Sequence, residues 1–180
     1  MMIVSLLSAC SASAKRTLDG HVFDIPKPHI IPDGDAPFFL PALDARDGFS
    51  FYLNPEASLP DRNLIAVASK DRICARAAGT AALVNATICA PHPPAWQDRP
   101  LHKVSDGVFW TYDLPAELGQ RSAASLASCS AMAEGSQPGL CMANLPYGNL
   151  VLTIYFRDDQ LAALPGLYDR SVANLKSWER

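Results

Sequence analysis

Short runs in which apolar and polar residues alternate recur along most of the chain, and this period of two is typical of half-buried β-strands. Residues 49–53 and 108–114 are the clearest runs, with apolar side chains at every second position. Weaker runs predict further short strands at residues 20–25, 64–68, 73–76, 87–89 and 140–145. Residues 149–156 are apolar on both faces, so this run should form a central strand of a sheet.

The end of the chain changes to a helical period. Apolar residues recur there at spacings of three and four, namely Leu164, Leu167, Tyr168, Val172, Leu175 and Trp178. Pro165 suits a first helical turn, so we expect the main helix to start there. Residues 116–133 are rich in Ser and Ala and could form a short helix or an ordered crossing, and residues 77–86 could form a helical turn. Together the pattern predicts an α+β fold, mainly an antiparallel sheet with a C-terminal helix packed on it.

The first residues form a different kind of segment. Residues 1–7 are mostly apolar, and the small residues Ser8 and Ala9 follow before Cys10. An apolar stretch before small residues is typical of a secretory signal, and this one is shorter than the ~20 residues that span a bilayer. No Lys or Arg precedes the stretch, so either the true start lies upstream or the signal is atypical. The alternative is a buried N-terminal strand with an ordinary cysteine.

The sequence Leu7-Ser8-Ala9-Cys10 resembles the lipobox of bacterial lipoproteins. This resemblance implies that residues 1–9 are removed, that Cys10 carries lipid and that residues 10–17 form a lipidated tether. Residues 18–180 would then be a single α+β domain in the periplasm. In this family Ser11, in place of aspartate, implies delivery to the outer membrane, with the anchor in its inner leaflet.

The cysteine count agrees with export. With Cys10 lipidated, four of the five cysteines remain and can pair fully. Three pairings are possible, and we favour Cys74–Cys89 and Cys129–Cys141 because each pair encloses a short segment with turn residues. Each loop would stabilise the fold by roughly 3 kcal/mol in the chain-entropy model. The alternative is four reduced, buried cysteines in a cytosolic protein.

Charge and motifs argue against several function classes. The net charge is −3 and no basic cluster extends beyond Lys15-Arg16, which gives no support for nucleic-acid binding. The chain has no GxSxG, P-loop, GxGxxG, HExxH or CxxC motif. The remaining metal-ligating types are scattered or fit no calcium-loop spacing: His21, His29, His92, His102, Asp33, Asp35, Asp44 and Asp47. We therefore expect no catalytic residue, no metal and no cofactor.

These observations favour a protein that acts by binding another protein. A small, disulfide-stapled lipoprotein of this architecture resembles the periplasmic immunity proteins that bacteria encode beside toxins of the type VI secretion system. The resemblance implies an immunity or inhibitor protein whose partner is a secreted toxin. Two alternatives stay open: a lipoprotein of envelope assembly or of the secretion machinery, which would bind an envelope component, and a cell-envelope enzyme.

The loop at residues 91–103 is the first candidate for the partner surface. It carries Trp96, Asp98 and Arg99 among several prolines, which lower the entropy that a loop loses on binding. Trp and Arg are also enriched among the residues that contribute most to binding. Phe38 and Phe39 form the second candidate. In the competing interpretation, Trp96 folds back and packs against the sheet.

Overall fold

The elements come from a computed structural model that describes residues 13–31, 48–77, 88–89, 95–115, 124–131 and 138–180. Its strands are β1 (Ser13–Leu18), β2 (His21–Pro26), β3 (Gly48–Tyr52), β4 (Leu64–Ser69), β5 (His102–Asp106), β6 (Phe109–Leu114), β7 (Ala124–Ser130), β8 (Leu140–Tyr147) and β9 (Leu150–Arg157). The helices are α1 (Lys70–Ala77) and α3 (Leu164–Trp178), and three short 3₁₀ turns are η1 (Lys27–His29), η2 (Leu59–Asp61) and η3 (Asp158–Ala163).

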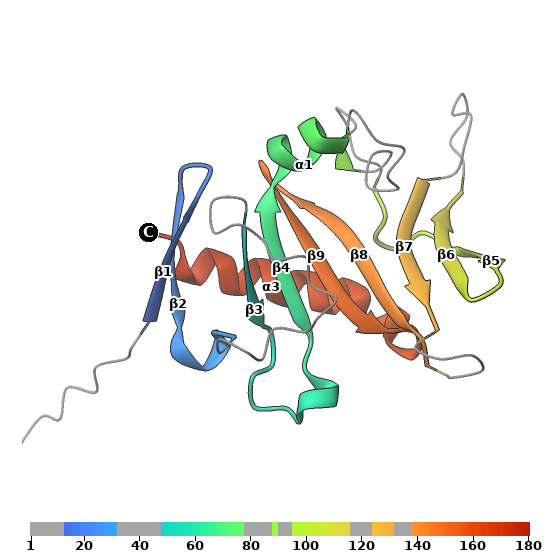
Figure 1. The fold of residues 1–180 in the computed structure, drawn as a ribbon, viewed down its shortest axis with the longest axis horizontal. Coiled ribbons are helices and arrows are strands. Elements are labelled where there is room, and N and C mark those ends of the chain that lie inside the picture. Colours follow the sequence, from blue (N-terminus) through green and yellow to red (C-terminus); the bar gives the residue numbers. More distant parts are fainter. Residues whose placement is uncertain (1–12, 32–47, 78–87, 90–94, 116–123, 132–137) are drawn as a thin grey trace, which may run out of the picture.

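Seven strands form one antiparallel sheet in the order β3-β4-β9-β8-β7-β6-β5 (Figure 1). The strand β9 lies inside this sheet between β4 and β8, which confirms that the run apolar on both faces is a central strand. The strand β8 precedes β9 and pairs with it over eight residue pairs, from Leu140↔Arg157 to Tyr147↔Leu150. The strands β3 and β5 lie at the two edges of this sheet.

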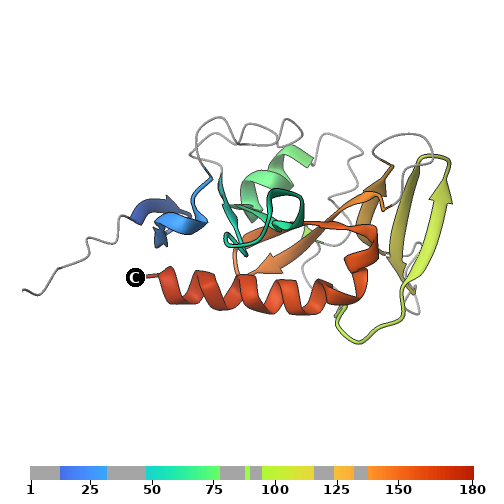
Figure 2. The ribbon, with the colours of Figure 1, turned by 90° about the horizontal axis from the view of Figure 1, so that it is seen from below.

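The helix α3 runs along one face of the sheet, and α1 lies on the opposite side (Figure 2). The apolar stripe of α3 is buried, including Leu167, Leu175 and Trp178. Ser171 is also buried there, and its hydroxyl donates a hydrogen bond to the Leu167 carbonyl at 2.7 Å, which satisfies this buried polar group. Leu164 starts the helix, with Pro165 in its first turn, and the predicted α+β fold with a covering C-terminal helix is confirmed.

The N-terminal strands β1 and β2 form a separate hairpin beside the C-terminus (Figure 1). Arg180 N–H donates to the Val22 carbonyl at 3.0 Å, and Phe23 is fully buried. Residues 13–17 of the expected tether lie in β1, where Ser13 pairs with Pro26. The sequence gives no sign of this strand, because β1 is mostly exposed and is held by main-chain bonds, which leave no apolar alternation.

Three further expectations are wrong. Residues 73–76 lie in α1 and not in a strand, and Ile88 and Cys89 lie outside any strand. A capping hydrogen bond marks the start of α1, because Arg72 N–H donates to the Ser69 hydroxyl at 3.3 Å. The Ser/Ala-rich stretch was expected to form a short helix or an ordered crossing, but residues 124–130 of it form the strand β7. The short strand β5 was not predicted at all.

Candidate partner-binding surface

A cluster of polar side chains ties the outer strands to the middle of the sheet. Asp158, the residue that follows β9, accepts hydrogen bonds at Oδ1 from the Tyr112 hydroxyl at 2.5 Å and from Trp110 Nε1 at 3.1 Å. Lys103 Nζ lies 3.4 Å from Oδ2 of the same carboxylate. These four residues, the Asp158 cluster, connect β5 and β6 to the end of β9, although β7 and β8 lie between them in the sheet.

The aromatic rings of this cluster make further contacts. The Lys103 ammonium lies 4.6 Å from the Trp110 ring centroid and 5.6 Å from that of Tyr112, which is within cation–π range. Trp110 also packs against bare backbone, since a Cβ at Gly139 would lie 2.3 Å from the indole ring. The Gly139 carbonyl also accepts from Asp158 N–H at 2.9 Å. Position 139 therefore requires glycine, because the Trp110 ring lies too close to the backbone for any larger side chain.

The electrostatics of the cluster set the protonation of its members. Burial opposes ionisation of the Asp158 carboxyl, but hydrogen bonds from Tyr112 and Trp110 and the charge of Lys103 outweigh it and lower its pKa below 3.8. Burial, with the bond to this carboxylate, raises the pKa of Tyr112 to about 12. Near neutral pH Asp158 therefore accepts hydrogen bonds, and Tyr112 donates one.

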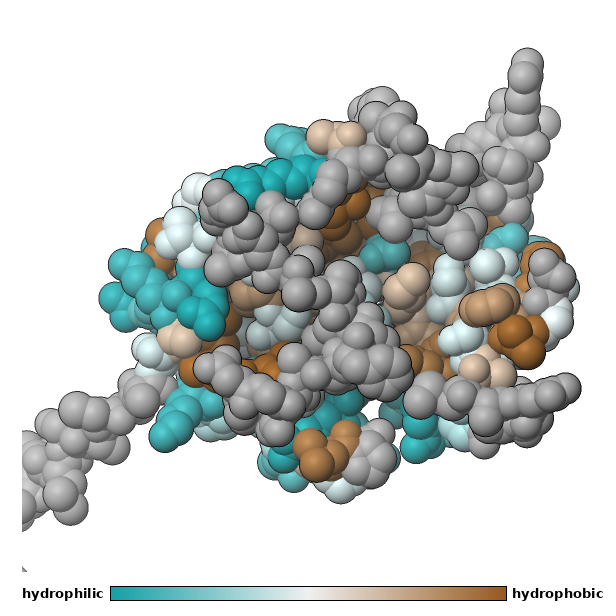
Figure 3. All heavy atoms as spheres, in the orientation of Figure 1, coloured by the Kyte–Doolittle hydropathy of each residue, from teal (hydrophilic) through white to brown (hydrophobic). Residues whose placement is uncertain are grey.

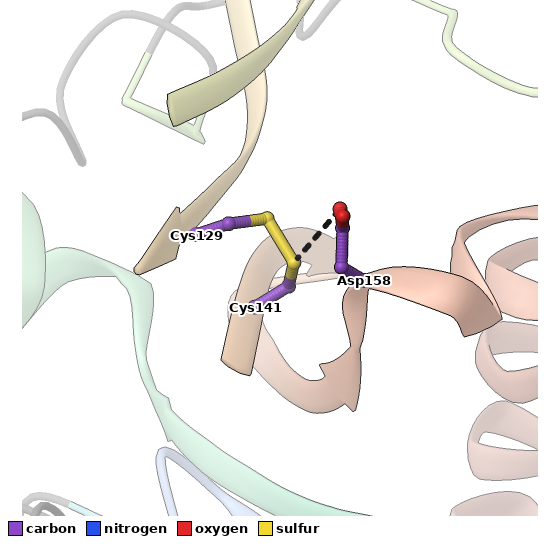
Figure 4. Close-up of side chains that lie close together, drawn as sticks. All are labelled: Cys129, Cys141 and Asp158. Carbon is purple, nitrogen blue, oxygen red and sulfur yellow. Dashed lines mark hydrogen bonds between the residues drawn. A yellow bond between two sulfur atoms is a disulfide. The ribbon is translucent and has the colours of Figure 1, made fainter. Parts of the chain in front are cut away.

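A disulfide adjoins the cluster. Cys129 and Cys141 lie directly opposite each other on β7 and β8 and are bonded, with their Cα atoms 4.0 Å apart. Asp158 Oδ1 lies 3.8 Å from Cys141 Sγ, the approach drawn as a dashed line in Figure 4. A disulfide sulfur carries no proton, so this approach is a contact and not a hydrogen bond. The same bond removes the thiolates that a metal would need, although Cys129, Cys141 and Asp158 have ligand-type atoms close together.

The second disulfide, Cys74–Cys89, links α1 to the segment that follows it, with Cα atoms 5.6 Å apart. Both cysteine pairs are those favoured from the sequence. Disulfides of this kind belong to oxidising compartments, which is the setting that the sequence predicts.

Three exposed apolar residues gather on the hairpin formed by β5 and β6. Val104 is 53% exposed, Val108 48% and Phe109 63%, and we call them the hairpin patch. Val104 lies opposite Thr111 and Phe109 opposite Ser130, at positions whose side chains alternate with those of buried Trp110 and Cys129. Val104 and Phe109 therefore lie on the face away from α3, with Val108 in the turn between β5 and β6, and brown residues mark this end of the molecule at the right of Figure 3.

The predicted partner residues are placed differently. Trp96 is half-buried, and its ring meets Tyr168 of α3 edge to face at a centroid distance of 5.5 Å. Asp98 is exposed with φ +61°, a left-handed conformation that Asp tolerates, and Arg99 N–H closes the turn on the Trp96 carbonyl at 3.4 Å. This placement favours the interpretation that Trp96 packs back, while partner contact through Trp96, Asp98 and Arg99 stays a prediction.

Other predicted residues lie outside the part of the chain that the structure describes. These are Cys10, Phe38, Phe39, His92, Asp33, Asp35, Asp44 and Asp47.

A second polar cluster joins the N-terminal hairpin to the rest of the fold. His21 Nδ1 lies 2.6 Å from Glu179 Oε1, and His21 Nε2 lies 2.7 Å from Asn149 Oδ1. The Asn149 amide is oriented by its Nδ2, which donates to the Asp19 carbonyl at 3.2 Å. Because both ring nitrogens face acceptors, the imidazolium form satisfies this site best, and the bonds to Asn149 and Glu179 raise the His21 pKa above 6.5. We call this group the His21 cluster.

The sequence missed both clusters. Lys103, Trp110, Tyr112 and Asp158 are spread over more than fifty positions, so no motif joins them. One signal was available: Trp110 and Tyr112 share the inward face of a predicted strand, and buried Trp and Tyr usually find a hydrogen-bond partner. The identity of that partner, Asp158, depends on how the sheet brings distant strands together.

Among the described residues no helix is long and apolar enough to cross a membrane. No protein-family model matches the chain, and no curated protein is significantly similar to it in sequence. A similar fold occurs in an immunity protein of the Stenotrophomonas maltophilia type IV secretion system, with a TM-score of 0.51 over 94% of each chain and 11% sequence identity. At this identity the likeness shows the fold alone. The secretion system of this structural neighbour is type IV, whereas the resemblance noted from the sequence was to immunity proteins of type VI systems.

Proposed function

We propose that this protein is a periplasmic immunity protein, which binds and inhibits a toxin delivered by a bacterial secretion system. The observation that carries the proposal is the fold it shares, over 94% of both chains, with an immunity protein of a type IV system. That neighbour gives no support to the narrower assignment to type VI toxins, so we propose the immunity role without a secretion class.

The surface of the domain suits this role. Inhibition by binding requires a rigid surface with exposed anchor residues, because ordering a flexible one on binding costs affinity. The hairpin patch provides such anchors, with Phe109 63% exposed. The Asp158 cluster and the Cys129–Cys141 disulfide hold the strands beneath the patch.

We also propose that Cys10 is lipidated and that residues 1–9 are absent from the mature chain. Because β1 begins at Ser13, the tether would shrink to residues 10–12, which reach about 10 Å when extended. The domain would then stand close to the membrane, with its anchor in the inner leaflet of the outer membrane.

Mass spectrometry of the native protein tests the anchor. The expected species starts at Cys10 and carries acyl chains, and a Cys10→Ala variant is expected in the soluble periplasmic fraction. A native chain that retains Met1 with an unmodified Cys10 would contradict the anchor but not the binding role.

Periplasmic co-expression tests the immunity role. Each gene next to the one for this protein is expressed with a periplasmic signal, with and without this protein. We expect one neighbour to arrest growth and this protein to restore it. The proposal is wrong if no neighbour is toxic, or if a toxic neighbour is equally toxic in its presence. An envelope defect in a deletion strain that lacks the toxin gene would favour the envelope-assembly alternative.

A further inference from the structure

The outer side of β5 is an open sheet edge. In the residues that the structure describes, no strand lies beyond β5. A two-residue turn joins it to β6, with Gly107 at φ +62° in the first central position, where hairpins of this type favour glycine. The pair Asp106 and Phe109 closes this turn, and hydrogen-bonded and open positions alternate from there. The main-chain groups of Lys103 and Ser105 therefore face away from β6.

This edge lacks the usual protection. Soluble proteins often place a lysine at an edge strand so that its charge repels a second strand. The strand β5 carries Lys103, but its ammonium lies over the Trp110 ring and reaches Asp158, on the side of the sheet that holds the core. The opposite edge differs, because β3 is met by a bridge from Ile30 to Phe51.

Two exposed apolar side chains lie beside the open edge. Val104 and Phe109 lie on the outer face, and Thr111 and Ser130 are their neighbours across the strands. Lys103 and Asp158 neutralise each other beneath them. A complementary partner is therefore an extended segment that carries apolar side chains opposite Val104 and Phe109.

We propose that the toxin binds β5 by strand addition. An extended segment of the toxin pairs with the outward main-chain groups of Lys103 and Ser105, and its apolar side chains cover Val104 and Phe109. This inference deepens the proposed immunity function and rests on it. The edge provides affinity through main-chain hydrogen bonds, and the hairpin patch provides selectivity.

Binding measurements with the purified toxin identified by growth rescue provide the first test. Ser105→Pro removes an outward N–H while leaving the pairing with β6, and Phe109→Ser removes the largest exposed apolar side chain. We expect each variant to bind the toxin at least about tenfold more weakly, with an unchanged melting temperature. Leu59→Ser is the matched control, since Leu59 is 68% exposed on η2 and should bind like the wild type.

Amide hydrogen exchange of the wild-type complex provides a second test that needs no variant. The Ser105 and Lys103 amides are expected to become protected when the toxin binds. Unchanged exchange at both amides, or wild-type affinity in both variants, overturns strand addition even if the protein still neutralises the toxin. If the free protein dimerises and the Ser105→Pro variant does not, the edge binds a second copy of this chain. That result also overturns strand addition by the toxin. If the wild type neutralises no neighbouring toxin, the immunity function itself fails, and this inference falls with it.

Discussion

The two ends of the molecule are each tied together by one ionised side chain, but the two sites differ in burial and in charge. At the β5 end, the Asp158 carboxylate is 13% exposed and collects donors from two other strands. At the other end, His21 is 25% exposed and its partner Glu179 32% exposed. The His21 contact should therefore contribute less than the Asp158 contact, because solvent screens His21 and Glu179 more than it screens the Asp158 carboxylate.

The two ends should also respond to pH in opposite directions. The Asp158 pKa is lowered in the fold, so its stabilisation is present above pH 3.8 and is lost as pH falls through the folded value. The His21 pKa is raised, so its stabilisation is full below pH 6.5 and is lost as pH rises through the folded value. Acid should therefore destabilise the β5 end first, and mildly alkaline solution should destabilise the contacts of the N-terminal hairpin.

The largest effect is expected for Trp110→Ala. Trp110 is 5% exposed, donates to Asp158 and packs on Gly139, so its removal leaves a cavity and takes one hydrogen-bond donor from the carboxylate. We expect the free energy of unfolding to fall by about 3–5 kcal/mol, measured by chemical denaturation. Trp110→Phe is the control, since it keeps most of the packing and should cost clearly less. Equal costs would show that the hydrogen bond, not the cavity, is what matters.

Asp158→Asn should have the next largest effect. It keeps the size of the side chain but removes the charge that Lys103, Trp110 and Tyr112 contact, at a cost of about 1–3 kcal/mol. Melting temperatures below pH 4 should depend less on pH in the variant than in the wild type. Asp159→Asn is the matched control, because Asp159 is exposed and bonds Arg157 instead. The same acid response in both variants would contradict the special role of Asp158.

Trp96→Ala separates packing from partner contact in the loop that leads to β5. Because Trp96 is half-buried against Tyr168, we expect a loss of about 1–2 kcal/mol in unfolding free energy, less than for Trp110. Toxin binding by the folded variant should stay near the wild-type value. An unchanged melting temperature with weakened binding would instead place Trp96 in the partner surface, as the sequence first suggested.

The smallest effect is expected for His21→Gln. Solvent exposure limits the cost to under about 1 kcal/mol, so pH dependence is the sharper measurement. The wild type should lose some stability as pH rises from 6 to 8, and the variant should not. His102→Gln is the control, because His102 is exposed and outside the cluster. A wild-type slope that persists in His21→Gln would remove His21 as its cause.

Local patterns predicted those elements in which buried apolar residues recur at a regular spacing along the chain. The run at residues 149–156 and the spacing from Leu164 to Trp178 identified β9 and α3, because each element buries a continuous face. Short loops with turn residues also favoured both disulfide pairs. The weakly patterned segments were interpreted wrongly: β1 and β5 are mostly exposed, and β7 uses Ser, Ala and Cys where the pattern expects large apolar residues.

The sequence by itself determined the α+β class, the central strand and the terminal helix, and it favoured the cysteine pairs, since these depend on residues close together in the chain. Only the tertiary structure decided which strands lie at the edges, and that Lys103, Trp110 and Tyr112 meet Asp158. It also decided that His21 meets Glu179, 158 positions away. Such contacts follow from the order of strands in the sheet, which packing of the whole chain sets and no local period encodes.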